Sequence, residues 1–142
     1  MQSRLPLSVA LITLDEEANL PRCLESIREL ASEVVVVDSG STDRTEAIAR
    51  QAGATFVSQP WQGFTGQKNI AFQRCTQPWV LCLDADEAVS PELAASIRQA
   101  LAGNPTAAAF SLNRRTNYLG DWIWHIWYPE WCVRLVRRDK AR

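Results

Sequence analysis

The sequence predicts one α/β domain with a mainly parallel sheet and helices on both faces. Three continuous, mostly apolar runs, at Ser8–Thr13, Val34–Val37 and Trp79–Leu83, indicate strands that are buried on both faces. Segments with helical spacing alternate with these runs, and this alternation implies right-handed strand–helix–strand crossovers. A length of 142 residues, 46% of them hydrophobic and 22% charged, suits a single globular domain.

The remaining elements follow from spacing and from turn residues. Apolar residues recur at helical spacing from Leu20 to Ala31, with Asn19 as the expected cap and Pro21 tolerated in the first turn. The segment Ser90-Pro91-Glu92 is typical of a helix start. The other expected elements are a helix at Arg44–Gln51 closed by Gly53, a strand at Thr55–Val57, a helix at Gln67–Cys75, a helix that ends at Gly103 and a strand at Ala107–Leu112.

Composition narrows the class of protein. A formal net charge of −1 gives no overall attraction to nucleic acid. The four cysteines contain no C-x-x-C pair, so we expect reduced core residues and no disulfide framework or zinc site. The sequence shows neither a signal peptide nor the roughly 20 apolar residues in a row that would cross a bilayer. These features predict a cytoplasmic protein.

Two carboxylates, Asp84 and Asp86, come directly after the apolar run at Trp79–Leu83. In an open α/β sheet the carboxyl ends of parallel strands face the ligand crevice. Nearby carboxylates repel one another unless a cation lies between them, and Mg²⁺ or Mn²⁺ binds one or two carboxylates together with substrate phosphates. The pattern is therefore interpreted as a metal–diphosphate site, with an acidic turn facing solvent as the alternative.

A second polar segment begins at Asp38, which ends the run Val34–Val37 and precedes Ser39-Gly40-Ser41-Thr42-Asp43. An acidic residue at a strand end, a turn of small residues and a helix start form a nucleotide-binding arrangement in several α/β folds. Asp43 and Glu46 also fit a capping pattern for the next helix, which is the structural explanation for those two acids.

Four segments in order resemble family 2 glycosyltransferases, which have the GT-A fold. They are Ser8-Val9-Ala10-Leu11-Ile12-Thr13-Leu14-Asp15-Glu16-Glu17, Val36-Val37-Asp38-Ser39-Gly40-Ser41-Thr42-Asp43, Gly66-Gln67-Lys68-Asn69 and Leu83-Asp84-Ala85-Asp86-Glu87. The run Asn113–Gly120 and the segments Trp127–Trp131 and Arg134–Arg138 resemble the lipopolysaccharide-core β-1,4-glucosyltransferase-like branch. Leu14 replaces the family's common Tyr and Ser39 its common second acid, so base stacking must be arranged differently.

The resemblance implies an inverting transfer of a sugar, glucose in that branch, from a UDP-sugar or other nucleotide-diphosphate donor to a lipopolysaccharide-core or other glycolipid or saccharide acceptor. It also implies roles for particular residues. Thr13, Glu16 and Asp38 would contact the nucleoside, and Lys68 would contact the diphosphate. Asp84 would lie near the ribose and the metal, and Asp86 would bind the metal. Before the resemblance is considered, Lys68 is equally well an exposed lysine near a helix start.

The general base is the missing part of this constellation. The family places a carboxylate well downstream of D-x-D, and the candidates in the acceptor-side region are Asp121 and Glu130, neither a close match. We therefore expect residues 1–112 to be the nucleotide-sugar-binding part and residues 113–142 the start of the acceptor-side part of a longer enzyme. The alternative function is a nucleotide-sugar-binding fragment without turnover.

Four of the six tryptophans lie between Trp122 and Trp131. Their aromatic mass suits a core element, an acceptor site that stacks on sugar rings, or an interfacial patch at the inner face of a membrane. The basic residues that would accompany such a patch are Arg134, Arg137, Arg138, Lys140 and Arg142. If further chain normally covers this segment, it should be found in a homo-oligomer contact or poorly ordered.

Overall fold

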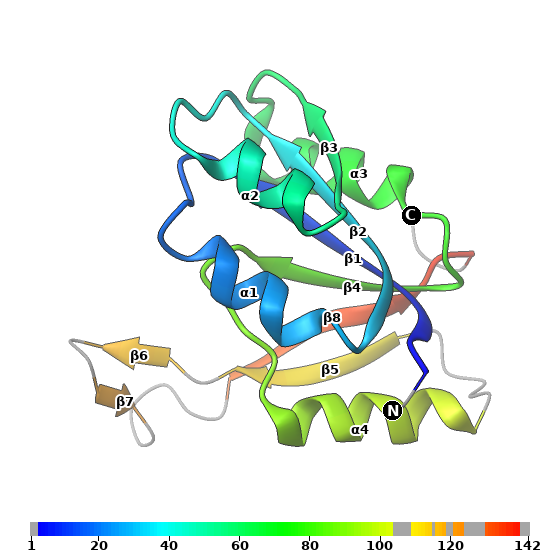
Figure 1. The fold of residues 1–142 in the computed structure, drawn as a ribbon. Coiled ribbons are helices and arrows are strands. Elements are labelled where there is room, and N and C mark those ends of the chain that lie inside the picture. The colour runs from blue at the N-terminus through cyan, green and yellow to red at the C-terminus, as the bar shows by residue number, and fades with distance from the viewer. Residues whose placement is uncertain (1–2, 104–108, 115, 119–120, 124–129, 140–142) are drawn as a thin grey trace.

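The computed structural model describes residues 3–103, 109–114, 116–118, 121–123 and 130–139, with side chains up to residue 103 and from Arg134 to Asp139. Figure 1 shows the arrangement of the elements. They are β1 (Leu5–Thr13), α1 (Leu20–Ile27), β2 (Ala31–Asp38), α2 (Thr45–Gln51), β3 (Thr55–Ser58), α3 (Gly63–Arg74), β4 (Trp79–Asp84), α4 (Pro91–Ala102), β5 (Ala109–Arg114), β6 (Thr116–Tyr118), β7 (Asp121–Ile123) and β8 (Glu130–Arg137).

The main sheet is mostly parallel, as predicted. Its strand order is β3-β2-β1-β4-β8-β5, and the first four strands run parallel to one another. Strand β8 pairs antiparallel with β4, and β5 pairs antiparallel with β8, so the last strand in the sequence lies inside the sheet. The short strands β6 and β7 form a separate antiparallel pair.

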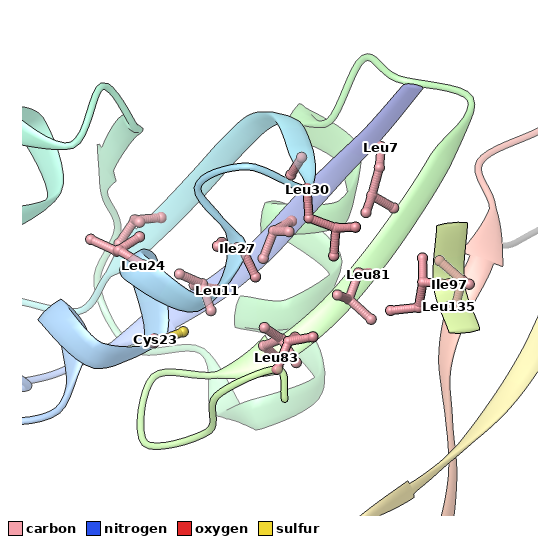
Figure 2. Close-up of a cluster of buried hydrophobic side chains, with 14 of the residues drawn as sticks. Leu7, Leu11, Cys23, Leu24, Ile27, Leu30, Leu81, Leu83, Ile97 and Leu135 are labelled. Atoms are coloured by element: carbon pink, nitrogen blue, oxygen red, sulfur yellow. The ribbon is translucent and has the colours of Figure 1, made fainter. Parts of the chain in front are cut away.

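Helices cover both faces of this sheet, which confirms the predicted layers. Residues of α1 and α4 pack with Leu11 of β1 and Leu81 of β4 in the larger core cluster, which Figure 2 shows in close-up. Ala71 of α3 packs with Ala10 of β1 on the opposite face, in a second cluster. Successive residues of a strand point to opposite faces, so a run such as Val9-Ala10-Leu11 must be apolar throughout.

The strand register brings the proposed site residues to one edge. Thr13 pairs with Asp38, and Asp38 pairs with Ser58. On the other side of β1, Ile12 pairs with Asp84. The carboxyl ends of the four parallel strands therefore meet, and their loops share this edge.

Some local predictions need correction. Asn19 makes no side-chain cap bond, because its amide donates to a Glu16 carboxylate oxygen at 3.3 Å instead. Helix α3 begins at Gly63, four residues before the predicted start, although Gly63 and Gly66 are poor helix formers. The buried amide of Gln67 donates to the carbonyl of Gln59 at 3.3 Å, so packing against the preceding loop supports the first turn.

Other local predictions are confirmed. The hydroxyl of Ser90 accepts the N–H of Leu93 at 3.1 Å and caps α4. Cys23 and Cys75 are buried and unpaired, as expected of reduced core residues. In the part of the chain that the structure describes, every helix is too short or too polar to span a membrane.

Candidate functional site

The loops after β1 and β2 are joined to each other by hydrogen bonds. The N–H of Asp15 donates to the Ser41 hydroxyl at 2.7 Å, and the Asp15 carboxylate accepts the N–H of Thr42 at 2.8 Å. The N–H of Glu16 donates to the Thr45 hydroxyl at 2.9 Å. Asp15 has a φ of 51°, in the left-handed region that favours glycine, so these contacts hold a backbone shape that would otherwise be unfavourable.

Asp43 belongs to the same pair of loops. Its carboxylate accepts the N–H and hydroxyl of Thr45, the first residue of α2, and the N–H of Glu17 in the facing loop. These bonds, led by the one from the Thr45 hydroxyl, hold the pKa of Asp43 below its usual value. The reciprocal capping box with Glu46 does not form, since Glu46 pairs with Arg50 at 2.9 Å. Asp43 therefore orders the loops as well as the start of the helix.

Asp38 is buried at the base of this loop pair, and its carboxylate accepts four hydrogen bonds. The hydroxyls of Thr13 (2.7 Å) and Ser41 donate to Oδ1, and the N–H groups of Gly40 (2.9 Å) and Ser41 (2.7 Å) donate to Oδ2. Burial acts to raise the pKa of Asp38, but the bonds from Ser41, Thr13 and Gly40 outweigh it and hold the pKa below its usual value. A carboxylate has about four acceptor sites, and these four hydrogen bonds occupy them. In this structure the Asp38 side chain therefore holds the loop after β2 in position.

Asp84 lies between two cations, which the sequence did not predict. Lys68 Nζ is 3.5 Å from its Oδ1, and Arg134 Nη2 is 3.9 Å from its Oδ2. Lys68 reaches Asp84 from α3, and Arg134 from β8 on the other side. The structure thus brings together the predicted Lys68 and Asp84 and adds a third charged group.

Arg134 is held by Glu87, the acid that follows the D-x-D segment. Glu87 Oε1 accepts Arg134 Nη1 at 2.9 Å and also the N–H of Asp84 at 2.8 Å. Arg134 also donates to the carbonyl of Cys82 at 3.2 Å, and its side chain is only 15% exposed. Arg134 therefore faces the site, which removes it from the basic patch proposed for a membrane surface.

Asp86 has an exposed side chain beyond the end of β4. Its backbone carbonyl accepts Arg22 Nη2 at 2.9 Å, which fixes the turn. Among the described residues the structure gives no protein partner to the Asp86 carboxylate, and no group of three or more His, Cys, Asp or Glu side chains gathers to hold a metal ion. Two carboxylate oxygen donors fit Mg²⁺ or Mn²⁺, which complete their coordination with water and phosphate oxygens.

The other predicted residues are spread along the same edge. Thr13 is buried and bonded to Asp38, while Glu16 is half-buried in the first loop. The edge also carries exposed apolar residues that sequence reasoning did not single out. The rings of Trp61 and Phe64 meet edge to face with centroids 4.9 Å apart and are 51% and 70% exposed. Trp61 follows closely on Gln59, whose N–H donates to the carbonyl of Asp38 at 2.8 Å.

Two predicted features lie largely outside the described residues. The backbones of Asp121, in β7, and Glu130, the first residue of β8, are placed, but their side chains are not described. Residues 124–129 of the Trp122–Trp131 segment are likewise not described. The base assignment and the roles proposed for the aromatic segment therefore stay predictions.

Solved structures with a similar fold include glycosyltransferases. S. aureus TarS 1-349 aligns with a TM-score of 0.66 at 19% identity, over 94% of this chain and 47% of that one. The mannosyltransferase PcManGT of Pyrobaculum calidifontis, solved with GDP-Man and Mn²⁺, aligns with a TM-score of 0.62 at 27% identity, over 80% of this chain and 37% of that one. The chain has the GT-A glycosyltransferase fold.

Sequence comparison gives the family. Residues 8–141 match the model of glycosyl transferase family 2, and the chain belongs to that family. A lipopolysaccharide core biosynthesis glycosyltransferase, LpsC of Rhizobium meliloti, is 38% identical over the whole chain and 54% of its own length. An uncharacterised glycosyltransferase of Rickettsia typhi, RT0209, is 36% identical over 95% of the chain and 47% of its own length. The chain thus spans about half the length of the curated relatives it matches.

Proposed function

We propose that this chain binds a nucleotide-diphosphate sugar and a divalent cation at the carboxyl edge of its sheet, as the donor-binding part of an inverting glycosyltransferase. The observation that carries the proposal is that Lys68, Asp84 and Asp86 lie together beside the loops after β1 and β2, which hydrogen bonds join to each other. A lysine beside two carboxylates offers one group to a diphosphate and two oxygen donors to a cation.

Asp84 and Asp86 would hold Mg²⁺ or Mn²⁺, which acts as a Lewis acid on the leaving diphosphate. Lys68 would donate to the diphosphate oxygens. Thr13, Glu16 and Asp38 would form the nucleoside subsite, with Asp38 acting mainly through the loop that it orders. The complexes of PcManGT with GDP-Man and Mn²⁺ and of the mycobacterial glucosyl-3-phosphoglycerate synthase with UDP (TM-score 0.57) support a nucleotide and metal at such a site.

The donor and acceptor are proposed from the relatives. The resemblance to the lipopolysaccharide-core β-1,4-glucosyltransferase-like branch supports UDP-glucose as donor. The name of the R. meliloti relative supports a core saccharide or other glycolipid as acceptor. A glycolipid acceptor would bring the protein to the inner face of the cytoplasmic membrane, where the Trp122–Trp131 segment would contact the acceptor, lipid or a second copy of the chain. Arg138 is exposed and suits such a surface.

The acids to test as general base are Glu130 and Asp121. In the antiparallel pair β4–β8, Leu81 pairs with Leu135, so Asp84, the last residue of β4, is level with Cys132, and the backbone of Glu130 lies two residues past the carboxyl end of β4. At about 3.3 Å per residue, four residues place it ~13 Å along the strand from Arg134.

Incubation of the chain with UDP-glucose, Mn²⁺ and a lipopolysaccharide-core acceptor tests the proposal. Glucose transfer that needs Mn²⁺ and is lost in Asp86→Ala supports a complete enzyme. Metal-dependent donor binding without transfer supports the alternative, a nucleotide-sugar-binding fragment. A folded chain that neither binds UDP-glucose nor transfers glucose would overturn both.

A further inference from the structure

The two cations beside Asp84 are held in different ways. Arg134 has a side chain that is 15% exposed, two contacts with Glu87 and a hydrogen bond to the Cys82 carbonyl. The Lys68 side chain is 45% exposed, and among the described residues the contact that the structure gives its ammonium is the one with Asp84, at 3.5 Å. One cation is therefore fixed in a network and the other makes a single loose contact.

The position of Lys68 creates a competition for Asp84. A divalent cation at Asp84 and Asp86 would have to share the Asp84 carboxylate with the Lys68 ammonium, and like charges that close repel. A bound diphosphate removes this conflict, because its oxygens can accept from Lys68. Arg134 offers no such exchange, since Glu87 holds it.

We propose that Lys68 exchanges partners, from Asp84 in the donor-free chain to the diphosphate in the loaded one, while Arg134 keeps its place. This inference rests on the proposed function. The exchange makes the metal ion and the nucleoside diphosphate bind cooperatively. This cooperativity adds to any that comes from direct contacts between the two ligands. Lys68 hinders the metal ion when it binds alone and favours the pair of ligands together.

The thermodynamic consequence is a coupling that depends on Lys68. The coupling factor is the ratio of the Kd for UDP without Mn²⁺ to the Kd with saturating Mn²⁺, and by linkage the same factor applies to Mn²⁺ affinity with and without UDP. Removing the Lys68 charge abolishes both the ion pair that a lone metal ion must break and the repulsion that follows. A loss of roughly two- to fivefold in the coupling factor is expected from a partly exposed pair.

The experiment compares four chains by calorimetric titration with UDP, with and without MnCl₂, and with MnCl₂ alone. They are the wild type, Lys68→Met, Lys68→Arg and Arg74→Met. Arg74 is exposed at the far end of α3, so Arg74→Met makes the same change in net charge on the same helix, away from the site.

Lys68→Met should weaken UDP binding in the presence of Mn²⁺ by about tenfold or more, because a charge-assisted hydrogen bond is lost. The same variant should bind Mn²⁺ alone more tightly and show the reduced coupling factor, whereas Lys68→Arg and Arg74→Met keep most of it. A coupling factor in Lys68→Met within twofold of the wild-type value overturns the exchange, even if UDP affinity falls. A folded wild-type chain that binds no UDP overturns the proposed function, and the exchange with it.

Discussion

Replacement of Asp38 tests whether its carboxylate holds the nucleotide-side loops together. In Asp38→Ala the N–H groups of Gly40 and Ser41 and the hydroxyls of Thr13 and Ser41 lose their acceptor. A donor left without a partner in a buried site costs about 1–3 kcal/mol, and the two backbone N–H groups cannot turn toward another acceptor. We therefore expect a loss of about 3–5 kcal/mol in the free energy of unfolding at pH 7.

Asp38→Asn gives a graded comparison. Its carbonyl oxygen can keep both N–H bonds, and the two hydroxyls can rotate to accept from its NH₂ group, so the charge is lost but the bonds survive. The expected cost is about 1–2 kcal/mol. Asp139→Asn is the control, because Asp139 is an exposed turn residue, and it should change stability by less than about 0.5 kcal/mol.

Urea denaturation at several pH values provides the assay. The pKa of Asp38 is lower in the folded chain than its usual value of 3.8, so the folded state favours the charged form. This contribution is fully present above pH 3.8 and is lost as the pH falls through the folded pKa. The difference between the wild type and Asp38→Asn should therefore shrink in acid. An Asp38→Ala variant that costs less than about 1 kcal/mol at pH 7 would refute the reasoning.

Three further predictions concern the metal ligand, the thiols and the base. Asp86→Ala should abolish the Mn²⁺ dependence of UDP affinity while leaving urea denaturation unchanged, since it removes an exposed carboxylate and no core packing; retained dependence in calorimetry would exclude Asp86 as a ligand. Burial raises the pKa of the Cys23 and Cys75 thiols to about 12, so both should react with a thiol reagent at pH 8 only after unfolding, and rapid labelling at either of these two positions in the native chain, located by peptide mapping, would contradict their burial. If the chain transfers sugar, one of the variants Glu130→Gln and Asp121→Asn removes the general base and should lower the rate about 10²–10⁴-fold with UDP affinity retained. Wild-type rates in both variants would exclude both acids.

The parallel half of the fold could be predicted from the sequence because its signals are local. The runs that became β1, β2 and β4 are apolar on both faces, and a strand covered by helices on both sides needs that pattern. The position of β8 between β4 and β5 could not be predicted in this way. Its segment Arg134-Leu135-Val136-Arg137 alternates less clearly, and its pairing with β4 joins residues more than 50 positions apart.

The candidate site also has one part that local sequence patterns predict and another that they do not. The carboxylates at the strand ends could be placed on one edge from the sequence, because parallel strands bring their carboxyl ends together. The bond between Thr13 and Asp38 and the network of Arg134 with Glu87 depend on register and on the direction of β8, which local patterns do not encode. The structure therefore adds a loop-ordering role for Asp38 to the nucleoside contact that the sequence predicts for it.

The most direct test of the donor site is paramagnetic broadening of the ¹⁵N-labelled chain by Mn²⁺ in the presence of UDP, with Mg²⁺ as the diamagnetic reference. Broadening should be strongest at the amides of Ala85 and Asp86 and extend to Lys68 and to Asp38, two strand spacings or ~10 Å from Asp84. The amino end of β1, seven residues or ~23 Å along the strand from the level of Asp84, should be broadened least. Broadening centred away from the D-x-D turn, or none at all in a folded chain, would contradict the account.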